Sequence, residues 1–356
     1  MSIMESNEVH VRRKRYKGTH PVSYDEKYKE HNPEKYADTV KHVMEKGMTP
    51  AGMHIPIMVP EIMDFLRIKP GQQGLDATLG YGGHTGEMLK RLDGKGHLYA
   101  TDVDCIESAR TEARLRKEGF GEDIFTVRQM NFADAGKLAK EVGKFDFVLA
   151  DLGVSSMQID NPERGFSYKH DGPLDLRLNP KEGITAAERL ATVSKDELYG
   201  MLTENADEEY AEEISDKITE HIRKGRKIDT TQKLRTVIEE ALGFIPAGER
   251  AEAVKKSCAR VFQALRIDIN NEFEVLYRFL DTLPEILKPC GRVAVLTFHS
   301  GEDRLVKKSF KQMKKDGIYS EIAEDVIRPS AAECARNKRA RSTKMRWAVK
   351  SENEEV

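Results

Sequence analysis

The chain has 356 residues, of which 58 are basic and 60 acidic, so its formal net charge is −2. With 39% hydrophobic and 33% charged residues, it has the composition of an ordinary globular protein rather than of a disordered tail. Its four cysteines form no C-x-x-C pair, which fits neither a disulfide framework nor a zinc site and favours a reducing compartment. No apolar run approaches the ~18 residues of a membrane span, so we expect a cytoplasmic protein with no membrane partner.

Basic residues gather near both ends of the chain. Residues 11–18 read VRRKRYKG, and residues 336–350 carry seven basic residues and no acid. One such run is more often a solvated surface than a nucleic-acid contact, but two runs in a chain of balanced charge make nucleic-acid contact a stronger candidate than one run would. A proline after Asn32, an apolar stripe and a stop at Gly47 predict one helix within an N-terminal extension, residues 1–53.

From residue 59 onward, helical and strand patterns alternate. Helices are predicted at 59–67, 87–92 and 106–117, and strands at 74–80, 97–102, 124–130 and 145–152. Short apolar strands separated by helices are typical of parallel βαβ units whose sheet is covered on both faces. The pattern therefore predicts an α/β fold with a doubly wound, mostly parallel, Rossmann-like sheet.

The next strand of this kind, 291–298, follows only after a long helical stretch. Helical periodicity is present near 185–203, 207–224, 231–242 and 258–283. A βαβ crossover needs far fewer residues, so we predict a small inserted helical domain for substrate recognition at 161–255. The sheet domain is then formed by 54–160 and 256–356, where a helix at 302–315 and strands at 318–328 and 345–349 complete a seven-stranded sheet.

A glycine-rich turn follows the first predicted strand. Gly80, Gly82 and Gly83 precede a helix at the place where a backbone can approach a nucleotide, and Asp102 ends the second strand, where a carboxylate can hold ribose hydroxyls. Thr85 stands where the last glycine of a dinucleotide motif is expected. A diphosphate is therefore not favoured, whereas S-adenosylmethionine has no phosphate to hold.

Two further strand ends point to the same cleft. Phe132 follows the third strand and could flank an adenine, and Asp151 follows the fourth strand at the expected mouth of the cleft. A core aromatic and a plain helix cap remain open as alternatives for these two residues. The long polar segment 151–177 contains a set of side chains suited to base stacking and phosphate contact: Arg164, Phe166 and Tyr168.

Six sequence blocks together carry a family resemblance. They read HIPIMVPEIMDFL, DATLGYGGHT, DLGVSSMQIDNPERGFSYKHDGPLDLR, FQALRIDINNEF, FHSGEDRLVK and NKRARSTKMR. In order and spacing they resemble the MraW/RsmH family of bacterial S-adenosylmethionine-dependent methyltransferases, which act on the N4 amine of a cytosine in small-subunit rRNA. The resemblance implies the cofactor S-adenosyl-L-methionine and the cofactor contacts Gly82, Gly83, His84, Asp102, Phe132, Asp151 and Gln158.

The resemblance also implies an RNA substrate, either small-subunit rRNA or the assembling small subunit. Candidates for contact with the reacting cytosine are Asp151, Asn271 and His299, and the expected RNA contacts near the C-terminus are Arg339, Arg341 and Lys344. No ligand spacing supports a metal site at the histidines. The oligomeric state stays open between a monomer and a homodimer.

The sequence departs from the family blocks at several places. KKSCAR precedes FQALRI where many members have His-Pro-Ala, Gly301 stands in place of a leucine, and Asn205-Ala206-Asp207 stands near the usual Gly-Glu-Glu. Because these departures lie away from the cofactor motifs, a paralogue that methylates another RNA or nucleobase-containing substrate is one alternative. A nicotinamide-dependent dehydrogenase and a noncatalytic ribosome-assembly factor are two others.

Overall fold

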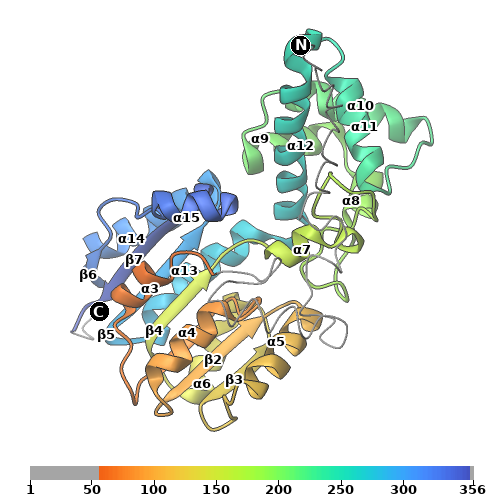
Figure 1. The fold of residues 1–356 in the computed structure, drawn as a ribbon. Coiled ribbons are helices and arrows are strands. Elements are labelled where there is room, and N and C mark those ends of the chain that lie inside the picture. The colour runs from red at the N-terminus through yellow and green to blue at the C-terminus, as the bar shows by residue number, and fades with distance from the viewer. Residues whose placement is uncertain (1–55, 353–356) are drawn as a thin grey trace, which may run out of the picture. The chain divides into compact units, whose positions relative to one another are not determined.

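The computed structural model describes residues 56–352 (Figure 1). The whole proposed extension, residues 1–53, lies outside the described residues, and with it the basic run at 11–18 and the predicted helix between Asn32 and Gly47. Within residues 56–352, no helix combines the length and the apolar character that crossing a bilayer requires.

Seven strands form one sheet. They are β1 (Gln73–Asp76), β2 (His97–Asp102), β3 (Phe125–Gln129), β4 (Phe145–Asp151), β5 (Leu287–Thr297), β6 (Tyr319–Ile322) and β7 (Lys344–Lys350). The strand order is β3-β2-β1-β4-β5-β7-β6, and every pair is parallel except the two that involve β7. This confirms the predicted seven-stranded, mostly parallel sheet, although β1 and β6 are shorter than the predicted strands.

Both faces of the sheet are covered by helices. Successive residues of the central strands point to opposite sides, and these residues are apolar on both sides, so each face needs a helical layer to bury it. Phe147 and Leu149 face the cluster that includes α3 (Val59–Leu66), α4 (Gly83–Leu92) and α5 (Cys105–Lys117). Val148 and Ala150 face the second cluster. That cluster includes α6 (Ala135–Val142), α13 (Glu272–Ile286) and α14 (Ser300–Lys315). Of these helices, α6 was not predicted from the sequence.

Five of the helices between β4 and β5, unlike α13, share a hydrophobic cluster apart from the sheet. They are α8 (Ala186–Thr192), α9 (Lys195–Ala206), α10 (Ala211–Arg223), α11 (Thr231–Ala241) and α12 (Ala247–Asn270). Leu202, Ile214, Ile238 and Leu265 are fully buried in this cluster, which contains no strand residue. The predicted boundary between residues 255 and 256 falls inside α12, and the division into domains stays a prediction.

Two predicted helices are interrupted in the structure. The segment 258–283 contains a break between α12 and α13 at Asn271, whose φ of 49° is left-handed, a conformation that asparagine tolerates better than most residues. The segment 185–203 is divided between α8 and α9, because the Ser194 side chain accepts a hydrogen bond from Glu197 N and starts a new helix.

Candidate active site

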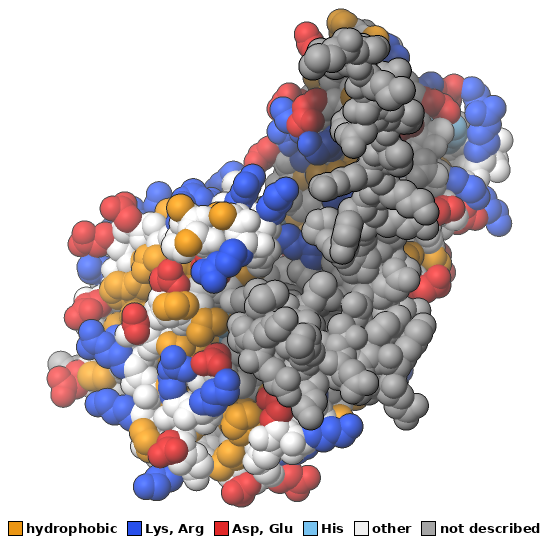
Figure 2. Space-filling model, in the orientation of Figure 1, with side chains coloured by type: hydrophobic (Ala, Val, Ile, Leu, Met, Phe, Trp, Pro, Cys, Tyr) orange, Lys and Arg blue, Asp and Glu red, His pale blue; other side chains and the backbone are white. Residues whose placement is uncertain are grey.

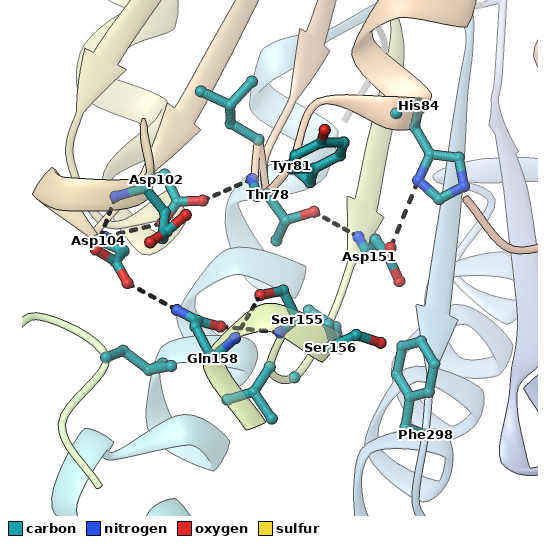
Figure 3. Close-up of a pocket in the computed structure, with 18 of the residues that line it drawn as sticks. Thr78, Tyr81, His84, Asp102, Asp104, Asp151, Ser155, Ser156, Gln158 and Phe298 are labelled. Atoms are coloured by element: carbon teal, nitrogen blue, oxygen red, sulfur yellow. Dashed lines mark hydrogen bonds and ion pairs between the residues drawn. The ribbon is translucent and has the colours of Figure 1, made fainter. Parts of the chain in front are cut away.

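A cleft with a volume of about 330 Å³ opens beyond the carboxyl ends of β1, β2 and β4. The strand order reverses between β1 and β4, which is where ligands bind in open α/β sheets. Figure 3 shows the cleft with loops from all three strands meeting around it. All seven predicted cofactor residues line it: Gly82, Gly83, His84, Asp102, Phe132, Asp151 and Gln158. Their roles stay predictions.

The glycine turn packs closely against its surroundings. Gly82 has a φ of 72° and caps α4, and a Cβ atom there would lie 2.7 Å from the Cγ2 atom of Thr111 on α5. A Cβ atom on Gly83 would lie 3.0 Å from Pro56. Both the backbone conformation at Gly82 and the lack of space therefore require small residues at this wall of the cleft.

Asp102 ties two loops of the cleft together. Its Oδ2 atom accepts a hydrogen bond from Gly80 N at 2.7 Å, and its Oδ1 atom accepts one from Asp104 N at 2.8 Å. Burial raises the pKa of this carboxyl from 3.8 to about 6. Each carboxylate oxygen has a second lone pair, so the group can still accept hydrogen bonds from a pair of ribose hydroxyls.

Asp104 was missed by the sequence analysis, although its position before a helix is typical of an N-cap. It is 1% exposed, and its Oδ1 atom caps α5. Its Oδ2 atom accepts hydrogen bonds from Gln158 Nε2 at 2.8 Å and from Arg164 Nη1 at 2.6 Å. The Asp104 carboxylate thereby holds Gln158 at the cleft.

This pairing corrects the prediction that Arg164 contacts RNA. Arg164 is 9% exposed and also donates to the carbonyl oxygens of Arg177 and Leu178. Its charge is needed where it lies, because Asp104 would otherwise be a buried, unpaired carboxylate.

Phe166 and Tyr168 are likewise not arranged as an exposed stacking surface. Phe166 is 9% exposed and belongs to the hydrophobic cluster of the helical segment. Tyr168 packs against the same cluster, with its ring in an edge-to-face contact with Phe262 at 5.9 Å between centroids. The prediction that Phe166 stacks on a base is therefore wrong for this structure, since its ring is used in the core.

Asp151 and His84 form a pair at the wall of the cleft (Figure 3). Asp151 Oδ2 lies 3.5 Å from His84 Nδ1, and His84 Nε2 lies 2.8 Å from the carbonyl oxygen of Ile57. Asp151 N donates to Thr78 Oγ1 at 2.6 Å, which fixes the end of β4. Asp151 Oδ1 is buried and has no hydrogen-bond partner among the described residues. Burial, together with the negative charge of Glu302, raises the pKa of Asp151 to about 7.

The other two candidates for cytosine contact do not line the cleft. Asn271 is exposed at the break between α12 and α13, so its predicted contact with the cytosine is not supported. His299 follows Phe298, which does line the cleft, but the His299 side chain is 11% exposed and its Nε2 atom lies 3.2 Å from Glu302 Oε1. Glu302 in turn accepts a hydrogen bond from Phe298 N and was not found from the sequence.

Three potential metal ligands nevertheless meet beside the cleft. One ligand atom each from Glu272, His299 and Glu302 lies within 4.8 Å of the others. Arg266, which lines the cleft, donates to both carboxylate oxygens of Glu272 at 2.8 and 2.9 Å. A guanidinium group therefore already supplies the positive charge that a metal ion would bring.

The predicted RNA contacts near the C-terminus differ in accessibility. Arg339 lines the cleft and pairs with Asp160 at 2.7 Å, and Arg341 is exposed. Lys344 is paired with Asp303 at 3.2 Å. Basic and acidic side chains are interspersed over the face of the molecule that Figure 2 shows, so the visible described surface has no large patch of one sign.

Comparison with known proteins identifies the family. A family model described as the MraW methylase family matches residues 51–351. The chain belongs to this family. It is 66% identical over 343 residues to "Ribosomal RNA small subunit methyltransferase H 1" of Lachnoclostridium phytofermentans, a match that covers 96% of this chain and 94% of the relative.

Two further relatives show how far the similarity extends. The protein of the same name from Agathobacter rectalis is 64% identical, with 98% of this chain and 100% of the relative covered. "Ribosomal RNA small subunit methyltransferase H" of Carboxydothermus hydrogenoformans is 38% identical, with 83% of this chain and 97% of the relative covered. The family resemblance predicted from the sequence blocks is thus confirmed, and the first fifty residues lie outside the family match.

Proposed function

We propose that this MraW-family methylase transfers a methyl group from S-adenosyl-L-methionine to the N4 amine of a cytosine in small-subunit rRNA. The observation that carries the proposal is Asp151, a buried carboxylate whose Oδ1 atom has no partner among the described residues and which lies on the wall of the cleft. Small-subunit rRNA is the substrate class that the names of the relatives give.

The charge of the cleft fits a sulfonium cofactor. Its ionisable lining, apart from His84, consists of four carboxylates and two guanidinium groups: Asp102, Asp104, Glu107, Asp151, Arg266 and Arg339. Arg164 pairs with Asp104 and Arg110 pairs with Glu107. The remaining two, Asp102 and Asp151, have no Lys or Arg partner among the described residues, and such carboxylates favour a positively charged sulfonium and oppose a diphosphate. This observation argues against the nicotinamide-dependent alternative.

The residues divide the work of binding and positioning. Asp102 holds the ribose, Phe132 flanks the adenine, and the small residues Gly82 and Gly83 let the backbone approach the cofactor. S-adenosylmethionine supplies a methyl group that is already strongly electrophilic. The protein therefore has to align the amine with that methyl group and strengthen its lone pair as a nucleophile.

Asp151 performs this second task. The lone pair of a cytosine amine is delocalised into the ring, and a hydrogen bond from its N–H to the Asp151 carboxylate returns electron density to the nitrogen. The base has to leave its stack to reach the cleft. We expect Arg339 at the cleft and the exposed Arg341 near it to bind phosphates adjacent to that base.

The decisive experiment methylates small subunits and free rRNA from a strain that lacks the gene and maps the product nucleotide by mass spectrometry. Asp151→Asn keeps the shape of the side chain and removes its charge, so the single-turnover rate should fall about 100-fold or more while cofactor affinity changes much less. Asp146→Asn, near the start of the same strand and away from the cleft, is the matched control.

Each alternative predicts a different result. If neither substrate is methylated while RNA still binds, the protein is an assembly factor. If NAD binds more tightly than S-adenosylmethionine, the protein is a nicotinamide-dependent dehydrogenase instead. A product at another RNA position would identify a paralogue with a different target.

A further inference from the structure

The hydrogen bond between His84 and Ile57 fixes which nitrogen of the imidazole carries a proton. A carbonyl oxygen can only accept, so His84 Nε2, at 2.8 Å from Ile57 O, must donate. In the neutral ring, the Nδ1 atom is then an acceptor. This acceptor lies 3.5 Å from Asp151 Oδ2, which is also an acceptor when the carboxyl is ionised.

Two acceptors that face each other in a buried site make a proton between them favourable. His84 is 6% exposed, and the side chain of Asp151 is 22% exposed. The other carboxylates around His84 are Asp76, Glu87 and Glu333, and Glu302 acts on Asp151. These negative charges strengthen the preference for one added proton on the pair.

The two oxygens of Asp151 have different surroundings. Oδ2 is directed to His84, whereas Oδ1 has no hydrogen-bond partner among the described residues. Asp151 therefore has acceptor capacity that the described residues leave unused, and its other oxygen lies next to a second proton acceptor (Figure 3). An isolated general base would need only the unused acceptor.

We propose that His84 is a positioning residue for catalysis, whose Nδ1 atom accepts a hydrogen bond from Asp151 once that carboxylate has taken the proton that the methylated amine releases. This inference rests on the proposed methyl transfer. The amine lone pair forms the new N–C bond while the C–S bond breaks with its electron pair remaining on sulfur. The amine, now cationic, loses its proton to the Asp151 carboxylate, and the resulting O–H group donates a hydrogen bond to His84 Nδ1.

The protonation states of the pair support this sequence of steps. Burial lowers the pKa of His84, and the pKa of Asp151 is raised to about 7, so near neutral pH the pair holds either no proton or one. Only the pair without a proton can accept one and become neutral overall. The pair with one proton would become a buried cation, which is costly. Methyl transfer should therefore increase as the pH rises through about 7.

The first test uses the protein without cofactor or substrate. The ¹⁵N spectrum is recorded on protein labelled at its histidines, and the His84 signals are identified because they are absent from His84→Gln. At pH 8 these signals should show a proton on Nε2 and none on Nδ1. The Nδ1 shift should change as the pH falls through about 7, where Asp151 takes up its proton, and Asp151→Asn should abolish that change. A proton on Nδ1 at pH 8, or a titration unaffected by Asp151→Asn, would overturn the inference.

The second test compares two histidine substitutions. The amide of Gln can still donate to Ile57 O but places no ring nitrogen beside Asp151, so at pH 8 and saturating cofactor His84→Gln should lower the single-turnover rate at least tenfold and shift its pH inflection downward. His97→Gln, whose ring contacts Thr126 and the Asp123 carbonyl outside the cleft, is the control.

The outcomes separate this inference from the proposed function. If wild type methylates rRNA and His84→Gln keeps the wild-type rate and pH profile, only the role of His84 is refuted. The same holds if the loss of rate is explained entirely by weaker cofactor binding. If wild type transfers no methyl group to either rRNA substrate, the proposed function itself fails.

Discussion

Asp102 offers the sharpest test of the cofactor site, because its carboxylate contacts both the protein and, as we propose, the ribose. Asp102→Ala removes the acceptor for the two ribose hydroxyls and releases the backbone N–H groups of Gly80 and Asp104, which now donate at 2.7 and 2.8 Å. A hydrogen bond to a charged group contributes about 1.5–3 kcal/mol. We expect the dissociation constant for S-adenosylhomocysteine to rise about 10- to 150-fold.

The pH dependence gives a second, independent expectation. Since burial raises the pKa of Asp102 from 3.8 to about 6, the folded protein holds this proton more tightly than the unfolded chain does. Ionisation therefore opposes folding: stability falls as the pH rises from about 4 to about 6, by an amount on the order of 3 kcal/mol. Asp102→Asn removes this cost, so at pH 8 it should not lower the thermal midpoint although it weakens cofactor binding.

The assay measures the dissociation constant for S-adenosylhomocysteine by calorimetric titration between pH 5.5 and pH 8. Wild-type affinity should weaken as the pH falls through about 6, and the Asp102→Asn protein should lose this dependence. Asp123→Asn, which changes an exposed carboxylate outside the cleft, serves as the control. A folded Asp102→Ala protein with a dissociation constant within twofold of wild type would show that the ribose is held elsewhere.

Three further outcomes are expected. Arg164→Met should destabilise the fold by about 3–5 kcal/mol in chemical denaturation, because Asp104 is left buried and unpaired; a loss below about 1 kcal/mol would mean that another group compensates the charge. Gly74→Ala should cost roughly 1–3 kcal/mol or more, since its Cβ atom would lie 2.1 Å from a phenylalanine ring on β4, and an unchanged midpoint would contradict this packing. Phosphate contacts release counterions, so each one lost should reduce the salt slope of RNA binding by about 0.7, and an unchanged slope would place the RNA path elsewhere. The variant for this last test replaces with Gln the three predicted contacts Arg339, Arg341 and Lys344.

The sequence by itself was sufficient for the sheet and for the wall of the cofactor site. Strand and helix patterns report whether a segment is buried on one face or two, and this property is local. The glycines at 82 and 83 follow the first predicted strand, and the carboxylates at 102 and 151 lie at the ends of the second and fourth. Because parallel strands bring their carboxyl ends to one edge, their convergence in one cleft followed from the pattern alone.

Only the tertiary structure could decide how the charged and aromatic side chains are used. Arg164 is a residue type that often contacts RNA, but in the interior it pairs with Asp104, which lies sixty positions away in the chain. Asn271 was placed at the cytosine by its motif, yet a left-handed break between two helices leaves it exposed. The pairing of His84 with Asp151 likewise joins α4 to the end of β4. Such pairings depend on distances between segments remote in sequence, which no local pattern contains, and they determine whether a side chain stabilises the fold or is available to a ligand.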